Sequence, residues 1–247
     1  MKFWNKITSL LFLLFSILLA SCSSDNSDKF VVATSPDNPP YEFFKSGQVV
    51  GFDIDFAEAL AKKMGKELDL KNMDFNGLIP ALSSGRIDAV ISAVSETEKR
   101  KEHVDFSDVY NESLVAILFK KISLITDIKS LEGKRVGVQL GTSWEQILRQ
   151  EIKKNPSITM LNMTNNLSLI EELKNNRISA VVLEKKQAEK FAEQYPEFSF
   201  FLMDDSNISK FAVVLQKGSK HRKKINEAIE SLRADGTLEI LERKWLR

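Results

Sequence analysis

The spacing of hydrophobic and polar positions alternates between two patterns along the chain. Short apolar runs such as 30–34 and 87–92 predict buried strands. Between such runs, apolar residues recur every three or four positions, as on the helix predicted to begin at Asp53 or Asp55 and to close at Gly65. The alternation of these patterns predicts an α/β fold in which helices cover the faces of open sheets.

One pattern of helix, turn and strand occurs twice. The segment 78–92 reads LIPALSSGRIDAVIS, and the segment 169–183 reads LIEELKNNRISAVVL. The two align without a gap, although a chance match is the alternative because all α/β units share such apolar spacing. Two related halves predict two lobes, and ligands of open α/β sheets gather outside the carboxyl ends of the strands.

The carboxyl ends of the two repeated strands carry opposite charges. Ala93, Ser95 and Arg100 follow the first strand, and they offer backbone groups, a hydroxyl group and a planar cation suited to a small carboxylate. Glu184 follows the second strand. If the lobes face each other, Arg100 and Glu184 lie across one cleft, which is the charge pattern of a free α-amino acid. The alternative is a plain strand end before a solvated helix, with Arg100 on the surface.

Two further segments point toward the same cleft. Thr142 and Ser143 open a helix after the strand 136–139, where free backbone N–H groups suit an anion. The alternative there is simple capping, because Ser143 with Gln146 fits a capping box. Phe75 directly precedes another helix, where a lone aromatic side chain would face the cleft, and the alternative is core packing.

The N-terminal residues have the pattern of a lipoprotein leader. Two lysines precede an apolar run, and Leu19-Ala20-Ser21-Cys22 then resembles a bacterial lipobox. This pattern predicts a signal peptide at 1–21, a lipid anchor on Cys22 and a flexible polar tether at 22–29. A soluble secreted protein whose signal happens to end in cysteine is the alternative.

Composition excludes several classes of function. The 247 residues are 43% apolar and 28% charged, with a formal net charge of +1. Acids and bases are mixed throughout, so we expect no nucleic-acid partner. Cys22 is the only cysteine, and His103 and His221 are the only histidines, without further ligands at suitable spacing. We therefore expect no metal site and no cofactor.

Five short motifs follow one another in the remaining sequence. They are VGFDID at 50–55, FNGLIPAL at 75–82, Arg100 with VDFS at 104–107, VGVQLGT at 136–142, and the segment 232–245 around Asp235-Gly236-Thr237. With these motifs in this order, the chain resembles the family 3 extracellular solute-binding proteins, the polar-amino-acid receptors of ABC importers. The resemblance covers nearly all of the mature chain.

The resemblance implies a two-lobed, type II periplasmic-binding-protein-like α/β fold. Each lobe is then an open sheet flanked by helices, and two crossing strands join the lobes. Lobe 1 would comprise 30–112 and 213–247, and lobe 2 would comprise 116–208. The hinge would lie near 113–115 and 209–212.

The resemblance also implies roles for the residues of the cleft. The guanidinium of Arg100 would pair with the ligand α-carboxylate, and Ser95 and Ser143 would assist it. The backbone carbonyl of Ala93 and the carboxylate of Glu184 would accept the α-ammonium group.

The side chain of the ligand is expected to meet Phe75 and Asn38. Many members carry a stacking aromatic where this chain has Asn38, and binders of basic amino acids often carry an aspartate where it has Ser35. Asp37 and Asp74, with Glu184, are the acids that remain near this pocket. The ligand therefore stays open among polar amino acids, with glutamine, histidine, arginine and cystine as candidates.

The sequence thus predicts a receptor rather than an enzyme. We expect a monomer, lipid-anchored on the extracytoplasmic side of a bacterial envelope, that captures a free polar amino acid and delivers it to an ABC permease. One alternative is a sensor or adhesin that binds amino acids without transport. Another is a cleft enzyme such as a small-acid dehydratase, in which Glu184 would act as the acid or base.

Overall fold

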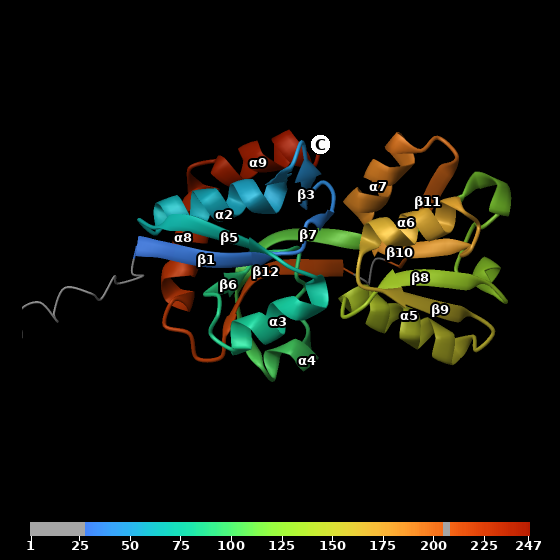
Figure 1. Ribbon diagram of the computed structural model, residues 1–247, viewed down its shortest axis with the longest axis horizontal. Helices are drawn as coiled ribbons and strands as arrows, with labels where there is room; N and C mark the ends of the chain where they lie inside the picture. Colours follow the sequence, from blue (N-terminus) through green and yellow to red (C-terminus); the bar gives the residue numbers. More distant parts are fainter. Residues whose placement is uncertain (1–27, 205–207) are drawn as a thin grey trace, which may run out of the picture.

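The structure is a computed structural model that describes residues 28–204 and 208–247. Figure 1 shows two bodies side by side, linked where the long strand β7 (Val104–Lys120) and strand β12 (Ile208–Gln216) pass between them. We call the body that holds the first strand lobe 1 and the other body lobe 2.

The N-terminal predictions fall on residues that the structure does not describe. The signal peptide at 1–21, the lipid-bearing Cys22 and most of the tether at 22–29 lie outside the described residues. Within the described residues, no helix combines the length and the hydrophobicity needed to cross a membrane.

The sheet of lobe 1 mixes parallel and antiparallel strands. Its order is β5 (Glu67–Asn72), β1 (Lys29–Thr34), β6 (Ala89–Val90), β12 and β7. β1 lies parallel between β5 and β6, whereas β12 runs antiparallel to both β6 and β7. A separate small sheet consists of β2 (Asp37–Asn38), β3 (Glu42–Lys45) and β4 (Gln48–Val50).

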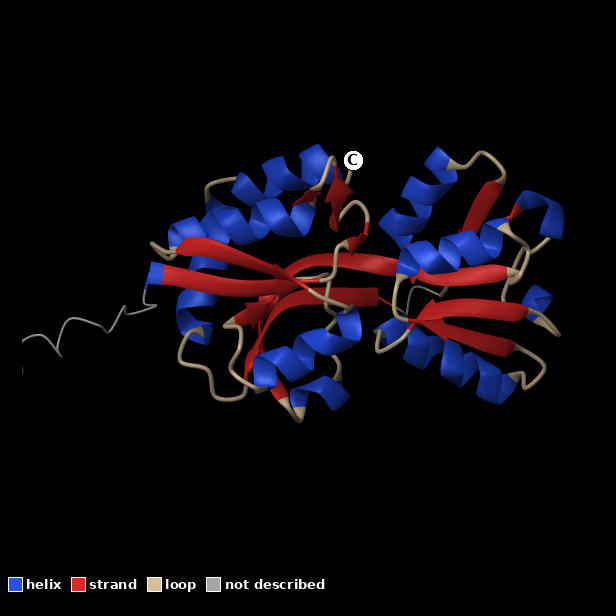
Figure 2. Cartoon of the chain, in the orientation of Figure 1, coloured by secondary structure: helices blue, strands red, loops and turns tan. Residues whose placement is uncertain are grey.

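Helices cover both faces of the lobe 1 sheet (Figure 2). α2 (Phe52–Lys63), α8 (Arg222–Ala234) and α9 (Thr237–Trp245) lie on one face, and α3 (Phe75–Ser83) and the short α4 (Glu98–Lys101) lie on the other. Each face has its own cluster of buried apolar residues. A sheet buried on both faces needs apolar residues at successive strand positions, which explains the continuous apolar runs in the sequence.

Lobe 2 repeats this layering on the far half of β7. Its strands are β11 (Phe198–Leu202), β7, β10 (Ala180–Glu184), β8 (Arg135–Gln139) and β9 (Thr159–Met163), in that order. α5 (Ser143–Lys154) packs on one face, whereas α6 (Asn166–Lys174) and α7 (Lys185–Gln194) pack on the other. Two short 3₁₀ helices, η3 (Lys121–Ser123) and η4 (Lys129–Leu131), follow β7.

The repeated unit predicted from 78–92 and 169–183 is confirmed. The first copy forms α3 and β6, and the second forms α6 and β10. Two crossing strands join the lobes as predicted, since β7 and β12 pair antiparallel along most of the length of β12. The hinge positions 113–115 and 209–212 fall within these two strands, and the lobe boundaries stay predictions.

The start of α2 differs from the prediction. Gly51 is its N-cap, at a φ of 136°, and no side chain caps the helix. A Cβ at this position would lie 2.1 Å from the carbonyl oxygen of Tyr41, so the close approach requires glycine. The predicted caps at Asp53 and Asp55 are therefore wrong, because both residues lie inside the helix and Asp53 accepts a hydrogen bond from the Ala93 N–H instead.

Candidate functional site

Arg100 lies buried between the two lobes. Thr97 caps the short helix α4, and its Oγ1 accepts a hydrogen bond from the Arg100 N–H at 3.3 Å. The Arg100 Nη1 donates to the carbonyl of Ser95 at 2.6 Å, and Nη2 donates to the carbonyl of Gly141 in lobe 2 at 2.9 Å. Burial lowers the pKa of this guanidinium to about 10, so it stays cationic at neutral pH. The alternative of a surface arginine is wrong, because only 8% of Arg100 is exposed.

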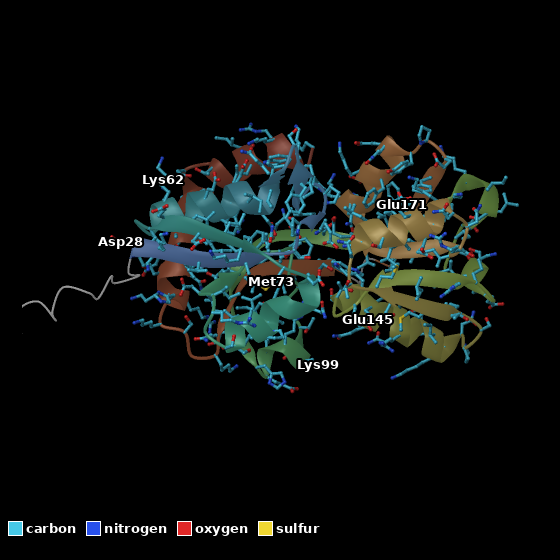
Figure 3. All side chains as sticks on the ribbon, viewed as in Figure 1. Asp28, Lys62, Met73, Lys99, Glu145 and Glu171 are labelled. Carbon is cyan, nitrogen blue, oxygen red and sulfur yellow. The ribbon has the colours of Figure 1, made fainter. Side chains whose placement is uncertain are left out.

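The start of α5 meets Arg100 from the lobe 2 side. The N-cap of α5 is Thr142, whose Oγ1 accepts from the Glu145 N–H at 3.1 Å. The Glu145 Oε2 reaches back to the Gly141 N–H at 2.7 Å, as in a capping box. The capping box predicted for Ser143 and Gln146 is therefore wrong by one residue. Figure 3 shows Glu145 on the side of lobe 2 that is near lobe 1.

Ser143 does not cap α5, and its side chain contacts the other lobe. Its Oγ donates to the Oγ of Ser95 at 3.0 Å. The hydroxyl groups of Ser95 and Ser143 thus lie together next to the Arg100 guanidinium, which is bound to the Ser95 carbonyl. Three residues that the sequence singled out as carboxylate-binding groups are assembled at one place.

Phe75 completes this region from lobe 1. It is the first residue of α3, and its ring centroid lies 5.7 Å from the Arg100 Cζ. Phe75, Arg100 and Gly141 line a cavity of about 120 Å³ together with Val94 and three further residues of α3, Asn76, Leu78 and Ile79. Phe75 also packs in the apolar core of lobe 1, where 9% of it is exposed, so core packing applies and its contact with a ligand stays a prediction.

Ala93 is held in a left-handed conformation by a buried acid. Its φ is 44°, which is uncommon for a residue with a side chain, and its N–H donates to the Asp53 Oδ2 at 2.6 Å. The Tyr110 hydroxyl donates to both oxygens of Asp53 at 3.0 Å. Asp53 thereby fixes the backbone two residues before Ser95, whose hydroxyl group contacts Ser143 of lobe 2.

A second buried acid, Glu42, lies beside Asp53. The Glu42 Oε1 accepts from Asn38 Nδ2 at 3.2 Å and from Ser92 Oγ at 3.1 Å. Burial raises the pKa of Asp53 to about 6, and burial together with the charge of Asp53 raises the pKa of Glu42 well above its usual range. A protonated Glu42 beside an ionised Asp53 satisfies both groups, since Glu42 Oε2 has no other hydrogen-bond partner among the described residues.

Glu184 lies at the boundary of the lobes and accepts hydrogen bonds from both of them. It ends β10 and caps α7, where it accepts from the Lys186 N–H at 2.7 Å and the Gln187 N–H at 2.9 Å. It also accepts from the Tyr41 hydroxyl of lobe 1 at 3.3 Å and from the Ser113 hydroxyl. Burial raises its pKa to about 7. The predicted pairing of Glu184 with a ligand ammonium stays a prediction.

Asp37, which the sequence marks only as an acid near the pocket, makes hydrogen bonds to the other lobe. Its Oδ2 accepts from Gln139 Nε2 at 2.8 Å and from the Asn166 N–H at 2.7 Å. Both donors belong to lobe 2, and no local pattern joins them to Asp37. Its neighbour Asn38 is also buried, and the Asn38 Oδ1 has no hydrogen-bond partner among the described residues.

The described residues contain no group of three or more histidine, cysteine, aspartate or glutamate side chains arranged to hold a metal ion. The site instead combines one buried cation with hydroxyl groups and backbone carbonyls from both lobes. Such a combination suits a small polar molecule that carries a carboxylate.

Comparisons with known proteins identify relatives of this chain. Bacterial extracellular solute-binding proteins, family 3, match this chain over residues 30–247. The arginine-binding extracellular protein ArtP of Bacillus subtilis is 36% identical over 235 residues, which cover 92% of each chain. A probable histidine-binding protein of Campylobacter jejuni is 32% identical over 234 residues, covering 92% of this chain and 88% of that protein.

A solved structure extends the likeness to three dimensions. An ancestral arginine-binding protein bound to arginine superposes with a TM-score of 0.84 at 37% identity, covering 89% of this chain and 99% of that one. The chain therefore belongs to the bacterial extracellular solute-binding proteins, family 3, and has their two-lobed type II fold. The relatives named here are described as binding proteins of amino acids and not as enzymes.

Proposed function

We propose that this protein captures a free polar amino acid between its lobes and delivers it to an ABC permease. The buried guanidinium of Arg100 carries the proposal, because it contacts both lobes and has the planar fork that binds carboxylates in pairs of hydrogen bonds. A guanidinium has five N–H donors, so donors remain for a ligand carboxylate beside the bonds to Ser95 and Gly141.

The neighbouring polar groups fit the two charged ends of an amino acid. The hydroxyl groups of Ser95 and Ser143 and the first turn of α5 at Thr142 supply further donors for the carboxylate. The α-ammonium group of the ligand donates hydrogen bonds to the Ala93 carbonyl and to the Glu184 carboxylate, as the family resemblance implies. Glu184 is held in place for this by its four protein donors.

Ligand capture by this site requires closure of the lobes. Burying a zwitterion costs several kcal/mol per charge unless each charge is paired, so only a closed form with groups from both lobes binds tightly. The ligand then shifts the population toward the closed form by hinge motion of the two lobes. The permease then binds the lobe surfaces in the arrangement that they have in the closed form.

The side chain of the ligand meets Phe75 and Asn38 in this proposal. The buried Asn38 Oδ1 without a partner suits a ligand side chain that donates hydrogen bonds. Relatives are named for arginine and histidine, and both side chains donate. Arginine and histidine therefore head the panel, followed by glutamine and cystine.

The proposed cellular location rests on the leader predicted from the sequence. Lipid on Cys22 would hold the protein, as a monomer, on the extracytoplasmic side of a bacterial membrane. Strand β1 begins at the end of lobe 1 that is remote from lobe 2 (Figure 1), so a tether there leaves the region between the lobes accessible. Cys22→Ser should move the protein from the membrane fraction to the soluble fraction; retention on the membrane would contradict the anchor.

A thermal-shift panel of the twenty amino acids with cystine tests ligand capture. A ligand that binds only the native protein raises Tm by mass action. We expect a rise with one or a few polar amino acids, and no rise with any of them would contradict the proposal. A strain that lacks the protein should also lose uptake of that amino acid, whereas unchanged uptake would favour the sensor.

A further inference from the structure

Asp37 makes three hydrogen bonds between the lobes that the ligand site does not use. It lies in β2 of lobe 1 and is 3% exposed. Its Oδ2 accepts from Gln139 Nε2 at 2.8 Å and from the Asn166 N–H at 2.7 Å, and its backbone carbonyl accepts from Gln187 Nε2 at 3.1 Å. Strand β8 and the first turns of α6 and α7 therefore all converge on one residue of the other lobe.

The donors that face Asp37 are arranged by lobe 2 itself. Gln139 Nε2 also donates to the carbonyl of Thr164 at 3.0 Å, and Gln139 Oε1 accepts from Asn166 Nδ2 at 2.9 Å. The Asn166 N–H lies at the first position of α6, where a helix has no acceptor of its own to offer. The acceptor for this pair of donors comes from Asp37 in lobe 1.

Opening the lobes exposes the carboxylate and both donors to water, whereas closing buries them together. If the carboxylate is removed, the closed form keeps one N–H of the Gln139 amide and the Asn166 N–H buried without an acceptor, and the open form does not. A buried polar group left without its partner shifts an equilibrium by roughly five- to a hundredfold. Loss of the Asp37 carboxylate should therefore favour the open form whatever ligand is present.

We infer that Asp37 is a latch between the lobes, a positioning residue that stabilises the closed form equally for every ligand and does not choose among ligands. The inference rests on the proposed function, since affinity reports closure. It assigns Asp37 a role apart from Arg100, whose donors meet the ligand itself.

Two substitutions separate a latch from a ligand contact. Asp37→Ala removes the acceptor, whereas Asp37→Asn keeps one side-chain oxygen for the lobe 2 donors and can turn its amide toward Ser35 Oγ, which lies 3.3 Å from Asp37 Oδ1. Asp69→Ala is the matched control, because it removes a lobe 1 carboxylate that pairs with Lys71 on the surface.

Calorimetry gives Kd for arginine and for glutamine, which differ in side-chain charge. We expect Asp37→Ala to raise Kd by the same factor for each amino acid that the wild type binds, roughly ten- to a hundredfold. Asp37→Asn and Asp69→Ala should stay within about threefold of the wild type. An unchanged Kd in Asp37→Ala overturns the latch. Loss of arginine binding alone, in both Asp37 variants, would overturn it in favour of a direct contact with the ligand side chain.

A second measurement reports closure without any ligand. Fluorophores on Lys62→Cys and Glu171→Cys, in a chain with Cys22→Ser, report the distance between exposed sites on separate lobes (Figure 3). Asp37→Ala should lower the transfer efficiency, and Asp37→Asn should restore it; equal efficiencies in all three chains contradict the latch. If the wild type binds no amino acid, the proposed function fails, and this comparison still tests the latch.

Discussion

The Arg100 guanidinium of lobe 1 donates a hydrogen bond to the Gly141 carbonyl of lobe 2 at 2.9 Å, which joins the two lobes at the centre of the site. Glu145 stabilises the loop that carries Gly141, because its carboxylate accepts a hydrogen bond from the Gly141 N–H. Residues that lie far apart in the sequence therefore present one cation and two hydroxyl groups together.

The pair of hydroxyl groups at Ser95 and Ser143 predicts a moderate effect on binding. Ser143→Ala removes a neutral hydrogen bond between the lobes and a donor for the carboxylate, which corresponds to roughly a two- to tenfold rise in Kd. Ser157→Ala, on the surface of lobe 2, is the control and should bind like the wild type. Calorimetry compares the two, and equal affinities would remove Ser143 from the site.

The buried acid Glu42 predicts a contrast between two substitutions. Glu42 is protonated in our account, so Glu42→Gln keeps a donor toward Asp53 and an acceptor toward Ser92. We expect a loss of less than about 1.5 kcal/mol in the free energy of unfolding for Glu42→Gln, and at least about 2 kcal/mol for Glu42→Ala. Urea unfolding at neutral pH measures both. A large loss in Glu42→Gln would show that Glu42 is ionised.

Three buried carboxyl groups predict how stability depends on pH. Burial raises the pKa of Asp37 to about 6, of Asp53 to about 6 and of Glu184 to about 7, each above its value in an unfolded chain. A group whose pKa is raised by folding contributes stability at low pH and loses it as pH rises through the folded value. The free energy of unfolding should therefore fall between about pH 4 and about pH 7, the range between the unfolded and the folded pKa values.

Urea titrations at about pH 4, 5, 6 and 7 follow this dependence. Asp53→Asn removes one titrating group and should flatten the profile, by up to about 1.4 kcal/mol per pH unit where that group titrates. A wild-type stability that rises across this range would contradict the assigned protonation states.

The backbone at Gly51 predicts a large local penalty. Gly51→Ala places a Cβ 2.1 Å from the Tyr41 carbonyl oxygen at a φ of 136°, which should cost on the order of 3 kcal/mol. Gly47→Ala is the matched control, because its φ of 80° brings strain of about 1–2 kcal/mol but no atom lies within 4 Å of the added Cβ. Thermal unfolding compares them, and equal losses would exclude the clash.

The repeat was predictable because each copy is a local pattern. The apolar spacing of α3 and α6 and the apolar runs of β6 and β10 all lie within about fifteen residues of sequence, the range over which periodicity is informative. The burial of Arg100 was predicted only through the pairing of two strand ends. The N-cap of α5 was misplaced by one residue, since Thr142 and Ser143 both have hydroxyl groups and the sequence does not distinguish them.

Contacts between segments that lie far apart in the chain could not be predicted from the sequence. The sequence predicts that Glu184 lies across the cleft from Arg100. No sequence pattern predicts the hydrogen bond that the Tyr41 hydroxyl of lobe 1 donates to Glu184. Asp37 was visible only as an acid, because its partners Gln139 and Asn166 reach it through the packing of whole lobes. Such pairs are set by topology, so they appear only when the fold is known.

Calorimetric titration of Arg100→Ala tests the central claim most directly. The wild type should bind its amino acid with one site per chain, and Arg100→Ala should bind it at least a hundredfold more weakly while its thermal unfolding stays cooperative. Arg86→Ala, an exposed arginine of lobe 1 beside Ser84, is the control and should bind normally. An Arg100→Ala variant with near wild-type affinity would contradict a site built on this guanidinium.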